Sequence, residues 1–404
     1  MPDVRSVTII GGGVIGCFLA YRLALEGVSV TIIERHSVGA GATGASAGNV
    51  QPGVMGEIVD AQGVLGTLGA QSLQLHRTFL PVIKESSGLD PLDHEVQYFY
   101  AALDAQEVAE TQQFTAALQA HSLRAEWIDG PAARALEPRL APHILGGALH
   151  QDCFQMDAYR FVSALSQAAQ RHGAQFQYSE VVGMQRAGEC VTGVRLKDGA
   201  TIACETLVLA MGAWTGVALA QWLGLTVPIG PYPLQKLHVR PAGPMPRCAV
   251  RWGDVNMVAR RDGMMHVGSK HDPTGFEAHP TDMGRHWLLE RFQTVFPNLA
   301  AEVVEARAGL GAETPDRTPI VGPLPGYPDV YVSVPSTNGF LLSAVMADML
   351  TALLVRGEQH PLLPMVLPAQ AMQRTFEAPA DSLRLASPPI PTVPRVCDGG
   401  GPPH

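Results

Sequence analysis

The chain has 404 residues, of which 46% are hydrophobic and 16% are charged, so it is long enough for two domains with sizeable apolar cores. Its formal net charge of −9, without a basic stripe, argues against nucleic acid as a main partner. The six cysteines are scattered with no C-x-x-C spacing, which argues against a disulfide framework and against a zinc site. We therefore expect reduced thiols and no bound metal.

The sequence also bears on location. No apolar run reaches the roughly 18–20 residues that a membrane-spanning helix needs, so we predict no transmembrane segment. The N-terminus enters a strand within a few residues and lacks the basic start and long apolar stretch of a signal peptide. We expect a soluble cytoplasmic protein and leave open whether it forms a homo-oligomer.

The first elements of the chain predict a βαβ unit. Residues 7–10 form a short apolar run typical of a buried parallel strand, and residues 14–26 carry helical spacing. Gly27 ends this helix, and residues 28–33 predict a second strand that Glu34 closes.

Three glycines at the turn between the first strand and the helix match the pattern G-x-G-x-x-G. Gly11 permits the tight turn, Gly13 lets the backbone approach a pyrophosphate, and Gly16 lets the helix pack closely on the sheet. The N-terminus of the helix offers N–H groups and positive dipole to the phosphates. Glu34 would accept hydrogen bonds from the adenosine ribose, which disfavours NADP. The motif predicts a dinucleotide site and leaves FAD and NAD open.

Further elements follow in chain order. Residues 39–49 have the composition of a flexible linker, but their place after the βαβ unit favours a loop in close contact with a cofactor. Residues 226–305 mix strand-like runs with one helix, and residues 387–404 predict a disordered tail. The other predicted helices are 62–86, 105–121, 160–172, 283–296 and 340–356, and the other predicted strands are 175–184, 190–202, 206–210 and 330–334.

Several motifs in this order resemble one family. The matching segments are residues 11–35, 42–48, 207–214, 314–323 and 338–342. Over about residues 7–357 the sequence resembles the glycine oxidase, D-amino acid dehydrogenase and sarcosine oxidase group of FAD-dependent amine oxidoreductases, and most closely its glycine-oxidase-like members. The resemblance decides the cofactor question in favour of FAD. It implies an enzyme that oxidises the C–N bond of a small amine or amino acid to an imine by hydride transfer to flavin N5, with O2 or another electron acceptor.

The same resemblance implies the architecture. The expected fold is α/β, α+β overall, with a doubly wound FAD-binding domain of the glutathione reductase type interrupted by an antiparallel-sheet substrate domain. The FAD-binding domain is expected at 1–85, 150–220 and 305–375, and the substrate domain at 86–149 and 221–304. Residues 376–404 are expected to form a tail.

The resemblance also implies which residues hold FAD. Glu34 and Arg35 are expected at the ribose, Val181 at the adenine side, and residues 336–341 at the pyrimidine end of the flavin. There a helix N-terminus would stabilise negative charge on the reduced ring. Some family members attach FAD covalently through a cysteine that maps near Gly309. This chain has no cysteine there, so we expect non-covalent FAD. The full expected set is Gly11, Gly13, Val14, Ile15, Gly16, Glu34, Arg35, Ala42, Thr43, Ala47, Gly48, Asn49, Val181, Gly212, Ser336, Thr337, Asn338, Gly339, Phe340 and Leu341.

Three substrate-contact positions depart from the family. Gly311 and Thr337 stand where glycine-oxidase-like members have arginines, and Asn256 stands where they have a tyrosine that reaches the substrate. Losing a bidentate carboxylate clamp removes on the order of 2–3 kcal/mol of charge-assisted hydrogen bonding. The FAD elements remain, so we expect an altered substrate and doubt plain glycine.

The remaining candidates are charged or titratable. Lys270 resembles the lysine that sarcosine-oxidase-like members place over the flavin to aid reaction with oxygen, and it could equally be a solvated loop lysine. His238, His266 and His271 more commonly serve as hydrogen-bonded structural residues, and we assign no catalytic base. Two alternatives stay open: a flavin hydroxylase, whose late Gly-Asp-Ala element is absent, and a flavoprotein subunit or dehydrogenase acting within a complex on a non-amino-acid substrate.

Overall fold

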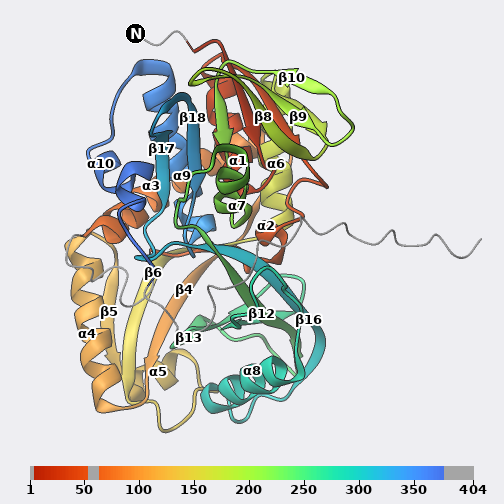
Figure 1. Cartoon of the computed structure of the whole chain (residues 1–404). Coiled ribbons are helices and arrows are strands. Elements are labelled where there is room, and N and C mark those ends of the chain that lie inside the picture. The colour runs from red at the N-terminus through yellow and green to blue at the C-terminus, as the bar shows by residue number, and fades with distance from the viewer. Residues whose placement is uncertain (1–3, 53–62, 377–404) are drawn as a thin grey trace, which may run out of the picture.

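The computed structural model describes residues 4–52 and 63–376. The chain forms two halves, one above the other in Figure 1, and each half has its own large sheet. The upper half contains a six-stranded sheet of order β17-β18-β11-β1-β2-β7, in which only β17 and β18 pair antiparallel. Its strands are β1 (Ser6–Ile10), β2 (Ser29–Glu34), β7 (Gln175–Tyr178), β11 (Leu207–Leu209), β17 (Ile320–Leu324) and β18 (Tyr327–Val334).

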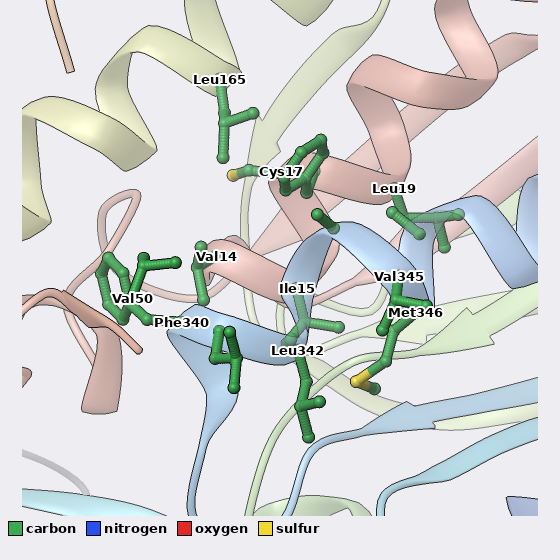
Figure 2. Packing of buried hydrophobic residues seen from close by; sticks show 14 of the residues in the cluster. Val14, Ile15, Cys17, Leu19, Val50, Leu165, Phe340, Leu342, Val345 and Met346 are labelled. Atoms are coloured by element: carbon green, nitrogen blue, oxygen red, sulfur yellow. The ribbon is translucent and has the colours of Figure 1, made fainter. Parts of the chain in front are cut away.

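Helices cover one face of this sheet. They are α1 (Val14–Leu25), α3 (Val64–Ser87), α6 (Ala158–Arg171) and α9 (Gly339–Thr351). Helix α1 lies among the other three, so it is buried on nearly every side and its sequence is apolar all round. Figure 2 shows Ile15 and Leu19 of α1 close to Leu342, Val345 and Met346 of α9.

The opposite face of the six-stranded sheet carries a second layer. It consists of helix α7 (Trp214–Leu223) and a three-stranded sheet of β8 (Val181–Ala187), β9 (Cys190–Leu196) and β10 (Thr201–Ala203). Strand alternation sends Ile9 to the helix side and Ile10 to this layer, so both faces of the sheet are buried. This arrangement confirms the predicted doubly wound fold.

The lower half is built on a mostly antiparallel sheet of order β16-β12-β15-β14-β13-β4-β6-β3, with β5 paired to β6. Its strands are β3 (Asn49–Val50), β4 (Leu92–Ala102), β5 (Ala125–Asp129), β6 (Gly146–Met156), β12 (Gly230–Pro241), β13 (Ala249–Trp252), β14 (Val255–Ala259), β15 (Met265–His271) and β16 (Ala301–Glu313). Strands β6 and β16 run across the domain boundaries predicted at 150 and 305. The division of the chain into those exact domain segments stays a prediction.

The two faces of the lower sheet differ in polarity. Leu237, Val250, Met257 and Val267 are fully buried on one face, against helix α8 (Asp282–Val295). The remaining helices of the lower half are α4 (Ala105–Ala120) and α5 (Gly130–Leu136). The alternate residues of the central strands, among them Lys236 and Asn256, lie on the opposite face. A polar face of the lower sheet is therefore turned away from its own core.

Helix α9 has an unusual composition for its place. It continues through the π-helical turn Ala352–Arg356, and the stretch Gly339–Arg356 has 18 residues and a mean hydropathy of 1.6. Within the described parts of the chain it alone is long and apolar enough to cross a membrane, and sequence reasoning did not pick it out. However, 67% of the stretch is buried inside the protein, where α9 contacts α1 and α3. Its place in the core accounts for its apolar sequence.

Candidate active site

A cavity of about 810 Å³ lies where the two halves meet. The residues after β1, β2, β11 and β18 form one wall, and residues of β12, β13, β14, β15 and β16 form the other. In open α/β sheets ligands bind at the carboxyl ends of the parallel strands, where neighbouring connections leave in opposite directions. The cavity combines that position with a wall from the polar face of the lower sheet.

The glycine turn shows why each glycine is needed. Gly11 has φ of +113°, and a Cβ there would overlap the carbonyl oxygen of Ala210. A Cβ on Gly16 would overlap the carbonyl oxygen of Gly11, so this glycine serves the packing of α1. Gly13 instead faces the cavity, where a Cβ would have Thr43 Oγ1 as its nearest neighbour at 3.2 Å. This arrangement fits the expected approach of a pyrophosphate to the backbone.

Backbone N–H groups hold the side chain of Glu34 in place beside the glycine turn. Its carboxylate accepts hydrogen bonds from the backbone N–H groups of Gly12 at 2.7 Å and His36 at 2.9 Å. Arg35 lies beside it with its guanidinium 4.2 Å from the ring centre of Trp214. Val181 lines the same end of the cavity, so these residues together fit an adenosine.

The loop after β2 lies between the two halves. Helix α2 (Ala42–Ala45) is followed by Ala47 and Asn49, which line the cavity. Thr43 Oγ1 accepts a hydrogen bond from the N–H of Val14 at 3.0 Å. Gly48 has φ of +78°, and a Cβ there would overlap the carbonyl oxygen of Met156. All the predicted cofactor residues line the cavity except Gly16 and Gly48, whose positions serve packing.

The N-terminus of α9 forms the far end of the cofactor wall. Ser336 to Leu341 line the cavity, and no side chain caps the helix at Asn338. Ser336 Oγ accepts a hydrogen bond from the N–H of Thr314 at 3.2 Å, which holds the preceding loop. The positive end of the α9 dipole therefore faces the cavity, where it favours negative charge.

Gly309 contacts the cofactor loop from the lower sheet. A Cβ on Gly309 would overlap the Cβ of Ala45, so β16 lies directly against α2. Position 309 therefore carries no thiol beside the loop that is expected to line FAD.

The three positions that depart from the family lie on different elements around the cavity. Gly311, Thr337 and Asn256 all line it, although they come from β16, the loop before α9, and β14. A Cβ on Gly311 would lie 3.2 Å from the carbonyl oxygen of Tyr232. Tyr232 stacks on His271 with ring centres 4.1 Å apart and planes 15° apart.

Lys270 lines the cavity, but a carboxylate neutralises it. Its ammonium group forms an ion pair with Asp272, and both side chains are largely buried. Asp272 also accepts a hydrogen bond from Gln235. The role of Lys270 in the reaction with oxygen stays a prediction, which must now include Asp272.

Sequence reasoning missed Lys236 and Arg251. Lys236 is 5% exposed, and its Nζ donates a hydrogen bond to the carbonyl oxygen of Ser46 at 2.7 Å. Burial, and then the positive charges of Arg307 and Arg260, lower the pKa of Lys236 to about 7. Arg251 lines the cavity from β13 beside Asn256. The alternation in β12 could have placed Lys236 opposite the core face, but it does not reveal that a cavity lies there.

The three histidines are neutral or nearly so at physiological pH. Burial lowers the pKa of His238 to about 4 and holds the pKa of His266 well below its usual value. Neither lines the cavity, whereas His271 does, and burial also lowers its pKa. His238 lies 3.6 Å from Glu305, measured from Nδ1 to Oε2. This placement fits structural roles for His238 and His266.

Two curated relatives are similar over most of the chain. Glycine oxidase of Pseudomonas aeruginosa is 29% identical over 367 residues, which cover 89% of this chain and 97% of that protein. Bifunctional protein ThiO/ThiG of Synechocystis sp. is 29% identical over 409 residues, or 97% of this chain. The chain spans 58% of that longer protein.

A solved structure shows the same fold, and a family comparison identifies the family. Glycine oxidase from Geobacillus kaustophilus superposes with a TM-score of 0.80 at 25% identity, covering 90% of this chain and 98% of that one. The sequence profile of the DAO family, described as FAD dependent oxidoreductase, matches residues 6–353. This match confirms the predicted enzyme class and FAD, which the protein binds non-covalently. With the cradle at Gly11–Gly16, the α9 N-terminus and a profile match over most of its length, the chain belongs to the DAO family of FAD-dependent oxidoreductases.

Proposed function

We propose that this enzyme oxidises the C–N bond of an amino acid or a closely related small amine to an imine. The observation that carries the proposal is the continuity of one cavity from the adenosine end at Arg35 to the polar face of the lower sheet at Asn256. The 29% identity to glycine oxidase supports the same reaction class. FAD, when bound, accepts a hydride from the carbon that carries the amine nitrogen.

The chain's own residues position the reactants. The N-terminus of α9 lines the cavity and would present positive potential to the pyrimidine end of the flavin, where it would stabilise negative charge on the reduced ring. The hydrogen bond from Lys236 to Ser46 joins the substrate sheet to the loop that lines the flavin. The imine product hydrolyses after it leaves.

The substrate we propose is larger than glycine. By the resemblance given above, Gly311 and Thr337 stand where glycine-oxidase-like enzymes have arginines and offer no guanidinium there, and Asn256 stands where they have a longer tyrosine. With these smaller side chains the substrate end of the cavity would be wider, and a hydrophobic or bulky amino acid or secondary amine would fit better. We further propose a cytoplasmic enzyme that passes its electrons to O2 or another acceptor.

Anaerobic mixing tests the proposal. The purified yellow protein is mixed without oxygen with amino acids, N-alkyl amino acids and plain amines, and the loss of the flavin absorption band is followed. We expect at least one bulky amino acid or secondary amine to bleach the band. A protein with full FAD content that no member of the panel reduces would contradict the proposal and favour a flavoprotein subunit acting within a complex.

A further inference from the structure

One row of residues crosses the lower sheet on its polar face. Strand register places Arg251 opposite Asn256, Asn256 opposite Gly268, and Gly268 opposite Lys236. Residues directly opposite one another in neighbouring strands point to the same face. Arg251, Asn256 and Lys236 line the cavity, so the row places one basic side chain on each side of Asn256 and the bare Gly268.

The side chain of Arg251 is largely buried, and no close carboxylate of the described residues neutralises its charge fully. Its side chain is 10% exposed, whereas its nearest carboxylate, Asp254, is 87% exposed and lies 3.8 Å away. Nε donates to the carbonyl oxygen of Gly253 at 2.9 Å, and Nη1 makes a long 3.4 Å contact with Asn256 Oδ1. A guanidinium has five N–H donors, and a buried charge needs a compensating partner. These contacts leave Arg251 able to bind a further anion.

The other cations that line the cavity either have closer partners than Arg251 has or lie away from Asn256. Lys270 forms its ion pair with the buried Asp272, and Lys236 donates to Ser46 with its pKa lowered to about 7. Arg35 stacks on Trp214 at the adenosine end. Arg317 lies in the loop between β16 and β17, away from β13, with Glu313 as a nearby carboxylate. Arg251 is the cation best placed beside Asn256.

We propose that Arg251 binds the carboxylate of an amino acid substrate, next to Asn256. The substrate carboxylate is thus held from β13, on the opposite side of Asn256 from β16, where Gly311 has no guanidinium to offer. The inference rests on the proposed C–N oxidation and narrows its substrate class to carboxylate-bearing amines. A planar guanidinium suits this task because it binds both oxygens of a carboxylate.

Equilibrium binding tests the inference without turnover. Benzoate and its neutral isostere benzamide are titrated into the oxidised holoenzyme, and the change in the flavin spectrum gives each Kd. We expect benzoate to bind the wild type and Arg251→Met to raise the Kd for benzoate at least tenfold, which is about 1.4 kcal/mol. The Kd for benzamide should change by less than about threefold, or ~0.6 kcal/mol. Arg251→Lys should recover part of the loss, because it keeps the charge without the fork.

A matched control removes one arginine elsewhere on the sheet. Arg240 is 58% exposed on β12 and pairs with Glu302 at the surface, so Arg240→Met should leave the Kd for benzoate unchanged. Equal FAD content in all variants shows that they fold. If the wild type does not bind benzoate, or if Arg251→Met binds it as tightly as the wild type does, the proposal is overturned. These outcomes differ from failure of C–N oxidation, which is measured by anaerobic reduction of the flavin.

Discussion

Lys236 Nζ lies 2.7 Å from the carbonyl oxygen of Ser46 and joins strand β12 of the lower sheet to the loop that lines the cofactor cavity. Folding lowers the pKa of this lysine from 10.5 to about 7. Between these pH values the unfolded chain binds more protons than the folded protein, so the free energy of unfolding rises with pH. Below about pH 7 the lysine is charged in both states, and the cost of burying it is fully present.

The variant Lys236→Met removes this pH dependence. Relative to the variant, we expect the wild type to gain about 1.4 kcal/mol of unfolding free energy per pH unit between about pH 7 and pH 10. Denaturant unfolding over a pH series measures the difference. Lys197→Met is the control, since Lys197 is 57% exposed and pairs with Glu180 at the surface. A constant difference between wild type and Lys236→Met would mean that Lys236 keeps its ordinary pKa.

Gly13→Asp should yield colourless protein. The new carboxylate would lie beside Thr43 at the expected pyrophosphate and repel it. Absorbance of the purified protein measures the FAD content, and heat should release FAD from the wild type into the supernatant. Gly188→Asp is the control, because Gly188 lies in the β8–β9 turn with φ of +65° and open space around it, a conformation that Asp tolerates. Full FAD occupancy in Gly13→Asp would refute the site assignment.

Lys270→Met tests the predicted reaction with oxygen. We expect reoxidation of the reduced enzyme by air to slow by more than tenfold, about 1.4 kcal/mol of barrier, with little change in its reduction by substrate. Stopped-flow absorbance separates the two half-reactions. Asp272→Asn should have the opposite effect on reoxidation, because it removes the negative charge paired with Lys270. An unchanged rate in Lys270→Met would assign Lys270 to a structural ion pair.

Gly311→Arg tests the altered substrate pocket. In the wild type we expect kcat/KM for glycine at least about a hundredfold below that of the best substrate, roughly 2.7 kcal/mol. Restoring the guanidinium should shift the preference toward small amino acids. A side chain at Gly311 requires the backbone of Tyr232 to give only slightly, since a Cβ there would lie 3.2 Å from its carbonyl oxygen. Gly311→Met controls for bulk without charge, and a wild type that prefers glycine would show that the pocket assignment is wrong.

The residues of the cofactor end could be predicted because close contacts of the backbone require glycine at particular positions of the sequence. A close contact between main chains admits only glycine, so the requirement at Gly11 and Gly16 can be read directly from the amino-acid sequence. Glu34 is visible for a similar reason, since it ends the strand beside that turn. The contacts of Gly16 and Glu34 lie within a single βαβ unit, whereas that of Gly11 is with Ala210 after β11, and the G-x-G-x-x-G pattern marks it all the same.

The substrate half could not be predicted to the same depth. Alternation in a strand separates two faces, but it does not tell which face meets water and which meets a cavity formed by residues two hundred positions away. The sequence therefore does not distinguish Lys236 from an ordinary surface lysine, because its partner Ser46 belongs to the other half of the molecule. The sequence likewise does not reveal that Lys270 forms an ion pair, because its pairing with Asp272 depends on side-chain geometry near the end of β15.

The close packing of Gly309 on Ala45 also determines whether the holoenzyme fraction depends on the concentration of free FAD. A cysteine at Gly309 would require α2 to move away from β16, so the contact between the two halves excludes a covalent tether at that position. For FAD held without a covalent bond, we expect the holoenzyme fraction to follow the free FAD concentration. Above the Kd, each tenfold increase in free FAD adds about 1.4 kcal/mol to the stability of the folded protein.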